Sequence, residues 1–162
     1  MTADSVTSQQ PRGWKASGRH GKWCNYGIKM GKEITVLIKV DADIVTARQE
    51  GRNLAAHIGF SSSDQVLIAT AISEAARNIL QYARSGEIII SSVKNGDKEG
   101  IMIIARDQGP GIKDIRRVME DGYSSSGSLG LGLPGIKRLM SELDLQSTPG
   151  KGTMLTFKKW KF

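Results

Sequence analysis

The sequence predicts an α+β protein: a two-layer sandwich with a mixed, mainly antiparallel sheet and helices on one face. Three observations lead to this class. Apolar residues alternate along residues 33–40, as they do in half-buried strands, and four further runs typical of strands follow at 87–93, 101–106, 145–147 and 153–160. Between these stretches apolar residues recur with a helical period, and the helical segments come in pairs. The resulting order, β-α-α-β-β-α-α-β-β, favours helices packed against one side of a sheet of hairpins.

The predicted domain begins with a strand and a helix. Residues 33–40 place four β-branched side chains on one face, which is typical of a half-buried strand. Asp43 has the character of a helix N-cap and Gly59 that of the residue just past a helix end, so we expect a helix over about 43–57. Its expected buried residues are Ile44, Val45, Ala47, Leu54, Ala55 and Ile58.

A second helix and a hairpin follow. Ser61–Asp64 is a helix start signal, and the helix is expected to run to about Ala83. Two β-rich runs, 87–93 and 101–106, flank an Asn-Gly pair at 95–96 that favours a hairpin turn. The buried positions expected on the helix are Val66, Leu67, Ile72, Ala76, Ile79 and Leu80.

The last third of the chain combines a segment rich in Gly and Ser with a helix and a hairpin. Residues 108–130 are expected to hold only a short helix, at about 112–120. A longer helix is expected over 133–143, because a proline stands in its first turn. The final two strands are expected at 145–147 and 153–160.

Residues 1–32 are predicted to be a basic, flexible tail, and residues 33–162 a single domain. The tail carries six of the 23 Lys and Arg residues and one acid, whereas the domain carries 17 basic and 15 acidic residues. The formal charge of +7 therefore resides mainly in the tail, and the near balance of the domain argues against a nucleic-acid partner. Met30 begins the domain pattern, which makes it an alternative start position.

Composition argues against several other classes. No apolar run approaches the roughly 18 residues that span a bilayer, and the N-terminus lacks the apolar core of a secretory signal. We therefore expect a cytoplasmic protein without a membrane partner. Cys24 is the only cysteine, which excludes an internal disulfide and a cysteine zinc site. The phosphate-loop motif GxxxxGK[ST] does not occur.

Glu74 and Asn78 are the first candidate site residues. They stand four residues apart on the second predicted helix and so lie on one face. An amide oxygen is a suitable ligand for Mg²⁺, and a carboxylate can accept a proton from a hydroxyl or a water. Taken alone, however, such a pair is more often a solvated polar stripe on an amphipathic helix.

The second candidate follows the predicted strand 101–106. Asp107 at a strand end can accept a hydrogen bond from an exocyclic amine. Gly109 and Gly111 permit positive φ and close backbone approach to a planar ligand. The same residues are also typical of a tight surface turn.

Residues 124–132 form the third candidate, because the backbone N–H groups of a Ser/Gly segment before a helix suit a polyphosphate. A flexible loop is the alternative. Gly130–Gly135 matches the dinucleotide fingerprint G-x-G-x-x-G, but neither the preceding strand nor the later acidic strand end is present, so we reject that fold. Thr153 follows a Gly-Lys-Gly run and can hydrogen-bond a base, although a hairpin turn explains the run almost as well.

The order of these motifs resembles that of the GHKL ATPase superfamily, in which E-x-x-x-N, D-x-G-x-G-I, a Ser/Gly lid and G-x-G-T follow one another. The resemblance covers residues from about 33 to 162. Within the superfamily the chain is most similar to the serine/threonine switch kinases of the bacterial stressosome. Five stretches carry that similarity: Ala47–Asn53, Ala71–Ile79, Asp107–Ile112, Val118–Gly122 and Gly132–Met140.

The resemblance implies a Bergerat-type site for ATP and Mg²⁺. Glu74 would be the general base for an acceptor serine, Asn78 would hold Mg²⁺ against the phosphates, and Asp107 would bind the adenine amino group. Residues 124–132 would form a lid, although Ser128 stands where a glycine is common. The implied nucleotide-binding residues are Asn78, Asp107, Gly109, Gly111, Ile112, Ser126, Gly127, Leu129, Gly130, Leu131, Gly132 and Thr153.

The resemblance also implies partners. STAS-domain scaffold or antagonist proteins would supply the acceptor hydroxyl, and the released kinase would activate a PP2C-type phosphatase or another downstream regulator. The alternative from another class is an ATP-dependent binding switch or an anti-sigma factor that needs no kinase activity.

Overall fold

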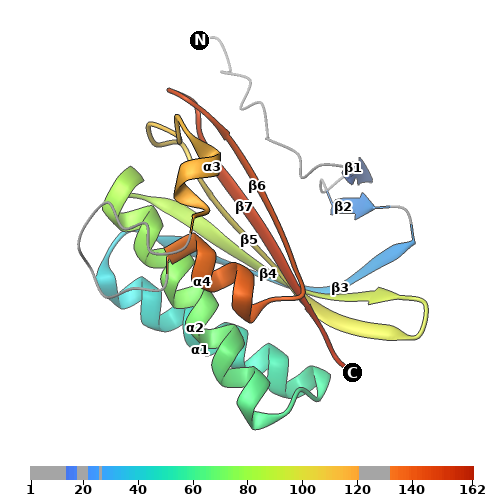
Figure 1. Cartoon of the computed structure of the whole chain (residues 1–162). Helices are drawn as coiled ribbons and strands as arrows, with labels where there is room; N and C mark the ends of the chain where they lie inside the picture. The colour runs from blue at the N-terminus through green and yellow to red at the C-terminus, as the bar shows by residue number, and fades with distance from the viewer. Residues whose placement is uncertain (1–13, 18–21, 26, 121–131) are drawn as a thin grey trace, which may run out of the picture.

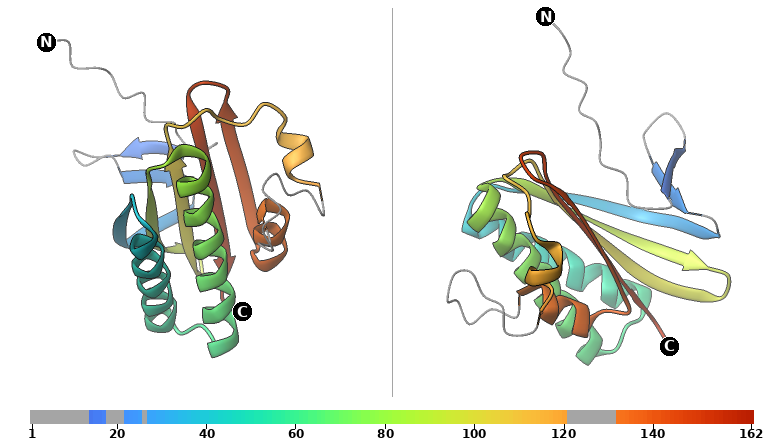
Figure 2. Two further views of the ribbon diagram at one scale, coloured as in Figure 1. Left: turned by 90° about the vertical axis from the view of Figure 1, so that its left-hand side faces the viewer. Right: turned by 45° about the horizontal axis from the view of Figure 1, so that its top comes forward.

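The computed structural model describes residues 14–17, 22–25, 27–120 and 132–162, and it has an α+β fold in two layers (Figure 1). The helices are α1 (Asp41–Ile58), α2 (Ser62–Asn78), the π-helix η1 (Ile79–Ala83), α3 (Ile115–Val118) and α4 (Gly132–Leu139). The strands are β1 (Trp14–Ser17), β2 (Lys22–Asn25), β3 (Ile28–Ile38), β4 (Gly86–Asn95), β5 (Lys98–Asp107), β6 (Glu142–Thr148) and β7 (Gly152–Trp160). The predicted class is confirmed, because the helices cover one face of the sheet in both views of Figure 2.

The described residues form a sheet of seven strands in the order β1-β2-β3-β4-β5-β7-β6, and every pair of neighbours among them is antiparallel. We expected a mixed sheet with a minor parallel component. β5 and β6 do run in the same direction, but β7 lies between them and pairs with both. No parallel pair therefore forms among the described strands.

The N-terminal part of the sheet differs from the predicted tail. β3 begins at Ile28, five residues before the expected strand start, and crosses the expected boundary at residue 32. Residues 14–17 and 22–25 pair as β1 and β2, although the sequence shows no apolar period there. β3 extends on the N-terminal side of Glu33 because Ile28–Met30 also pair with β4. The register of the pairing shifts between Met30 and Glu33. The division into a tail and a domain stays a prediction.

The first helix starts earlier than expected. Val40 is its N-cap, and the Asp43 carboxylate accepts hydrogen bonds from the N–H groups of Lys39 (2.8 Å) and Val40 (2.9 Å). Asp43 is thus the third helical residue rather than the cap. The helix ends as predicted at Gly59, which has φ +99° and donates to two carbonyls of the last turn.

The buried stripes of α1 and α2 are narrower than predicted. Val45 and Val66 are 57% and 50% exposed, which corrects their placement in the core. The fully buried residues of α1 are small apart from one leucine: Ala47, Gly51, Leu54 and Ala55. Figure 2 (left) shows α1 and α2 side by side, and a Cβ added at Gly51 would meet the Ile72 side chain of α2, so the small residue permits this approach. Val45 and Val66 lie outside the contact.

The chain after the second helical pair also differs from the prediction. The expected helix over 133–143 ends at Leu139, and residues 142–148 form strand β6. The N–H of Ser141 donates to the Lys158 carbonyl (2.9 Å), which starts the ladder with β7. Strand pairing therefore overrides the helical pattern of residues 140–143. The expected final hairpin is confirmed as β6 and β7. The short helix expected at 112–120 is α3, at Ile115–Val118.

The central strands β4, β5 and β7 are buried on both faces. On one face Ile88, Ile103 and Phe157 are fully buried among the core residues that α1, α2 and α4 share. On the other face a second cluster gathers Ile28, Ile89, Val93, Met102, Ile104, Met154 and Trp160. Among the described residues, no helix is long and apolar enough to cross a membrane.

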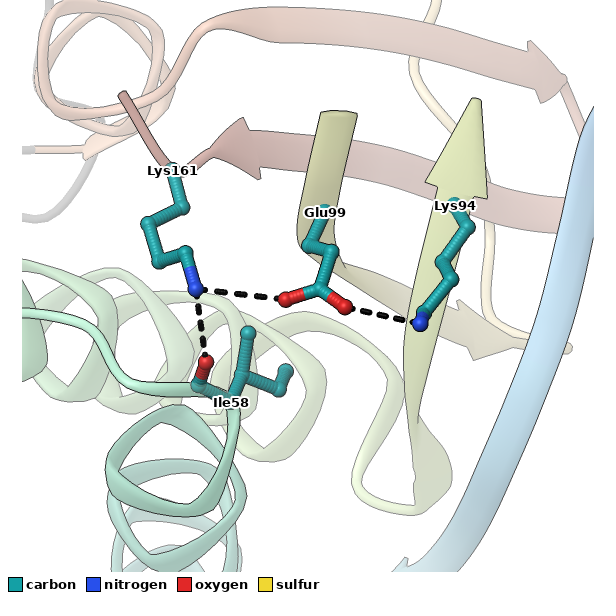
Figure 3. Close-up of polar contacts among 4 residues, drawn as sticks. All are labelled: Ile58, Lys94, Glu99 and Lys161. Atoms are coloured by element: carbon teal, nitrogen blue, oxygen red, sulfur yellow. Dashed lines mark hydrogen bonds and ion pairs between the residues drawn. The ribbon is translucent and has the colours of Figure 1, made fainter. Parts of the chain in front are cut away.

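The C-terminal end of the chain is fastened to the end of α1. Figure 3 shows the Lys161 ammonium between the Ile58 carbonyl (3.0 Å) and a Glu99 carboxylate oxygen (3.2 Å). The other Glu99 oxygen contacts Lys94 at 2.7 Å, and the two lysines hold the pKa of this carboxyl below its ordinary value. Lys161 thus satisfies a carbonyl in the last turn of α1, where cations are favoured.

Candidate functional site

A pocket of about 420 Å³ lies between α2, η1 and the adjoining ends of β5 and β7. Its volume is within the range of small-molecule sites. Predicted site residues from four separate segments line it together: Glu74, Asn78, Asp107, Gly111, Ile112, Gly132 and Thr153. Ser126, Gly127, Leu129, Gly130 and Leu131 lie outside the described residues.

The helical wall of the pocket carries Glu74 and Asn78 one turn apart on α2. The Glu74 side chain is 12% exposed, and its carboxylate is 2.6 Å from the guanidinium of Arg77. Directly after Asn78 the helix widens into the π-helix η1, where we expected a regular helix to Ala83. Single π-turns within helices are frequent at functional sites.

The opposite wall is formed by Asp107, the last residue of β5, which pairs with Thr153 near the start of β7. One oxygen of the Asp107 carboxylate accepts the N–H of Gly109 at 2.9 Å. Burial raises the pKa of Asp107, and hydrogen bonds from the backbone N–H groups of Gly109 and Thr153 oppose that rise. Asp107 therefore presents hydrogen-bond acceptors to a pocket whose walls include Ala105 and Leu155.

The glycines of the Asp107 loop approach the protein's own chain. Gly111 has φ +73°, and a Cβ there would lie 2.9 Å from the backbone carbonyl carbon of Thr148. Gly109 has no positive φ, and a Cβ there would lie 2.6 Å from the Cβ of Ala83. The expected positive φ is thus found at Gly111 alone. Both glycines let the loop pack against neighbouring segments, and close approach of this loop to a ligand stays a prediction.

Ser147 is a residue of the site that no sequence motif indicated. Its hydroxyl accepts the N–H of Ile112 (2.8 Å), donates to the Gly152 carbonyl (2.9 Å) and lies 2.9 Å from the Thr153 hydroxyl. It therefore joins the loop after β5 to the β6–β7 hairpin. The register that places Ser147 opposite Thr153 is visible only in the folded sheet.

Three cations of the pocket were also not predicted: Arg77, Lys113 and Arg117. Arg77 stands three residues after Glu74, and this spacing is the one signal that could have identified it. Basic side chains at the edge of a pocket suit an anionic ligand such as a polyphosphate. The described residues hold no cluster of three or more His, Cys, Asp or Glu side chains for a metal ion.

Glu74 and Arg77 also line a second pocket, of about 500 Å³, which opens between α1 and α2. Its other lining residues are Asp41, Ile44, Val45, Arg48, Thr70 and Ser73. Glu74 is therefore accessible from two sides. One side leads to Asp107 and Thr153, and the other leads to the surface between the two long helices.

Comparison with known proteins places this geometry in a family. Residues 39–159 match the model of the histidine kinase-like ATPase domain. The chain is 56% identical over 131 residues to serine/threonine-protein kinase RsbT of Bacillus subtilis, covering 81% of this chain and 98% of that protein. It is 34% identical over 99 residues to the anti-sigma F factor of Thermoanaerobacter sp. (strain X514), covering 57% of this chain and 68% of that protein.

A solved structure with the same fold contains the RsbU and RsbW domains of a Mycobacterium tuberculosis protein. The TM-score is 0.55 at 21% identity, over 82% of this chain and 34% of that one, so this likeness shows the fold alone. The family match over most of the chain and the identity to RsbT over nearly all of that protein carry the assignment. The chain belongs to the histidine kinase-like ATPase family and, within it, to the serine/threonine-protein kinases related to RsbT.

Proposed function

We propose that the chain binds ATP and Mg²⁺ in the 420 Å³ pocket and transfers the γ-phosphoryl group to a serine or threonine of a STAS-domain partner. One observation carries this proposal. Glu74 and Asn78 on α2 and Asp107 and Thr153 on β5 and β7, distant in sequence, line one pocket of suitable size.

The base end of the nucleotide site lies at Asp107 and Thr153. The Asp107 carboxylate is an acceptor for the exocyclic amine of adenine. Apolar side chains of the pocket, including Ile79, Ala105 and Leu155, suit the faces of a purine ring. Gly109 acts indirectly, because its N–H orients the Asp107 carboxylate. Ile112 lines the pocket itself, and its N–H donates to the Ser147 hydroxyl.

The phosphate end lies toward Asn78 and the N-terminus of α4. Asn78 offers an amide oxygen, and Mg²⁺ is usually held by few protein ligands together with substrate phosphates, so the donor set fits this ion. When bound, Mg²⁺ supplies positive charge that neutralises the phosphate oxygens. Lys113 and Arg117 add cationic side chains to the same wall. The lid role of residues 124–132 remains part of the proposal.

Glu74 is the proposed general base. Glu74 lines both pockets, so an acceptor hydroxyl can reach it from the side of α1 while the nucleotide occupies the other side. Glu74 takes the hydroxyl proton, the hydroxyl oxygen bonds to the γ-phosphorus, and the bond to the β-phosphate oxygen breaks to leave ADP. Arg77 holds the Glu74 carboxylate in place at 2.6 Å.

The proposed partners follow from relationship rather than geometry. Similarity to RsbT supports a stressosome-type module in the cytoplasm, in which a STAS-domain scaffold or antagonist protein is the substrate. Released from that scaffold, the kinase binds and activates a PP2C-type phosphatase. The second pocket, with Arg48 and Arg77 beside apolar Ile44 and Val45, is a surface that such a partner can contact next to Glu74.

A second candidate function has its own support. Several anti-sigma F factors are 31–34% identical to the chain, and they match over 57% of its length. An ATP-dependent binding switch or anti-sigma factor needs the same nucleotide pocket but no transfer step. Capture of a sigma factor by the chain, with ATP bound and with no phosphate incorporated into STAS proteins, would favour this alternative.

The test is to incubate the chain with Mg-ATP and candidate STAS-domain proteins and to map phosphoserine and phosphothreonine. We expect transfer by the wild type and loss of transfer by about 10²–10⁴-fold in Glu74→Gln, because the base is removed. Glu50→Gln is the matched control, since Glu50 lies on α1 and lines neither pocket. Wild-type transfer by Glu74→Gln would show that the base assignment is wrong.

A further inference from the structure

Behind the base end of the pocket lies a hydroxyl whose hydrogen-bonding capacity is fully used. A serine hydroxyl has one proton to donate and two lone pairs that accept. The Ser147 hydroxyl contacts three groups, namely the Ile112 N–H (2.8 Å), the Gly152 carbonyl (2.9 Å) and the Thr153 hydroxyl (2.9 Å). Ser147 does not line the pocket, whereas Thr153 does.

These three contacts determine the direction of each bond. The Gly152 carbonyl can only accept, so it takes the single proton of Ser147. The Ile112 N–H can only donate, so it occupies one lone pair of Ser147. The remaining lone pair of Ser147 faces Thr153, and the Thr153 hydroxyl must therefore donate its proton to Ser147. With its proton engaged in this way, Thr153 has only lone pairs to offer the pocket.

We infer that Ser147 is a positioning residue that fixes the hydroxyl of Thr153 as an acceptor, so that the pocket selects a 6-aminopurine over a 6-oxopurine. This inference rests on the proposed function. Asp107, which pairs with Thr153 across β5 and β7, also presents acceptor oxygens. We place both side chains at the exocyclic group of the base and not at the neighbouring ring nitrogen, because an acceptor at that nitrogen would pair with the ring N–H of a 6-oxopurine. An exocyclic amine then donates to both side chains, whereas an exocyclic carbonyl meets two acceptors, and unpaired buried polar groups are costly.

The test compares ATP with inosine triphosphate, which differs in having a carbonyl and a ring N–H where adenine has an amine and a ring nitrogen. Dissociation constants for both nucleotides are measured by calorimetry in Mg²⁺, with the full chain. In Ser147→Ala the Thr153 hydroxyl is free to rotate and donate to the carbonyl. We expect the preference for ATP over inosine triphosphate to fall by about three- to tenfold, the range of one neutral hydrogen bond.

Further variants separate positioning from loss of structure. Thr153→Val should reduce the preference by a similar factor, and the double variant should add little to either, because both changes remove one interaction. Ser147→Thr keeps a hydroxyl and should restore the preference. Ser141→Ala is the matched control, since Ser141 also accepts a backbone N–H, from Trp160 at 3.1 Å, at the far end of the same hairpin.

The outcomes separate failure of the Ser147 inference from failure of the proposed nucleotide-binding function. An unchanged ratio of the two dissociation constants in Ser147→Ala, in a variant that melts cooperatively and binds ATP, overturns the inference alone. An equal fall in the preference for ATP in Ser141→Ala also overturns the inference, because the loss would then reflect a general loss of stability in the hairpin. Failure of the wild-type chain to bind either nucleotide overturns the proposed function and, with it, the inference.

Discussion

Replacing Gly152 by alanine should disturb the site more than replacing Gly150, two residues earlier in the same turn. Both glycines have positive φ, +105° and +79° respectively, so either alanine adopts an unfavourable backbone conformation. The two positions differ in the space around them. A Cβ at Gly150 meets nothing within 4 Å, whereas one at Gly152 overlaps the Asp107 carbonyl oxygen and lies 2.9 Å from the Cα of Gln108.

The magnitude follows from these two terms. The left-handed backbone costs about 1–2 kcal/mol for a residue with a Cβ, and this applies to both variants. At Gly152 the contact at 2.9 Å must open by about 0.5 Å to reach ordinary van der Waals distance, and overpacking of this kind adds about 1–3 kcal/mol. The reduced flexibility of the unfolded chain is common to both variants and cancels in their difference.

Thermal unfolding followed by circular dichroism measures the difference. For a chain of this size 1 kcal/mol shifts the melting temperature by about 2–4 °C, so Gly152→Ala should melt about 2–12 °C below Gly150→Ala. The shift moves Asp107 relative to Thr153, so the Gly152 variant should also lose the stabilisation that added ATP gives the wild type. Equal melting temperatures for the two variants would refute the reasoning.

Two further predictions concern charge. Burial raises the pKa of Asp107, so the folded state holds this proton more tightly than the unfolded state, and stability falls as pH rises above the ordinary aspartate pKa of about 4. The melting temperature of Asp107→Asn should therefore rise relative to that of the wild type as pH is raised from about 4, and a difference that does not change with pH would contradict this. Lys161→Met removes the bonds to Ile58 and Glu99 and should melt lower than Lys151→Met, which alters an exposed lysine. Part of that decrease should persist at high salt because the Ile58 carbonyl is neutral, and complete recovery in salt would contradict the assigned bond.

Local patterns make much of the fold and site predictable. The four-residue spacing of Glu74 and Asn78 is a property of any helix, and the Asn-Gly pair at 95–96 is compatible with few structures other than a hairpin turn. Asp107 follows a continuous apolar run, Ile101–Ala105, that is typical of a buried strand, so its place at a strand end is also local information. Glu74, Asn78 and Asp107 share one pocket with Thr153. This could be predicted only from the order of the motifs, because no local pattern connects residues so distant in sequence.

Features set by long-range pairing are not predictable in this way. Leu143 fits the helical spacing from Leu139 as well as the strand spacing to Leu145, and pairing with β7 decides the outcome. The insertion of β7 between β5 and β6 depends on the whole sheet. Ser147 acquires its role only through that insertion, since its three partners come from the loop after β5 and from β7.

We propose that Glu74, Asn78, Asp107 and Thr153 form one site for Mg-ATP. Calorimetric titration with a non-hydrolysable ATP analogue in Mg²⁺ tests it most directly. We predict one site per chain, affinity weakened about ten- to a hundredfold in Asp107→Asn through loss of a charge-assisted bond, and affinity nearly retained in Glu74→Gln, which acts in transfer. Wild-type affinity in Asp107→Asn, or no binding by the wild type, would contradict the claim.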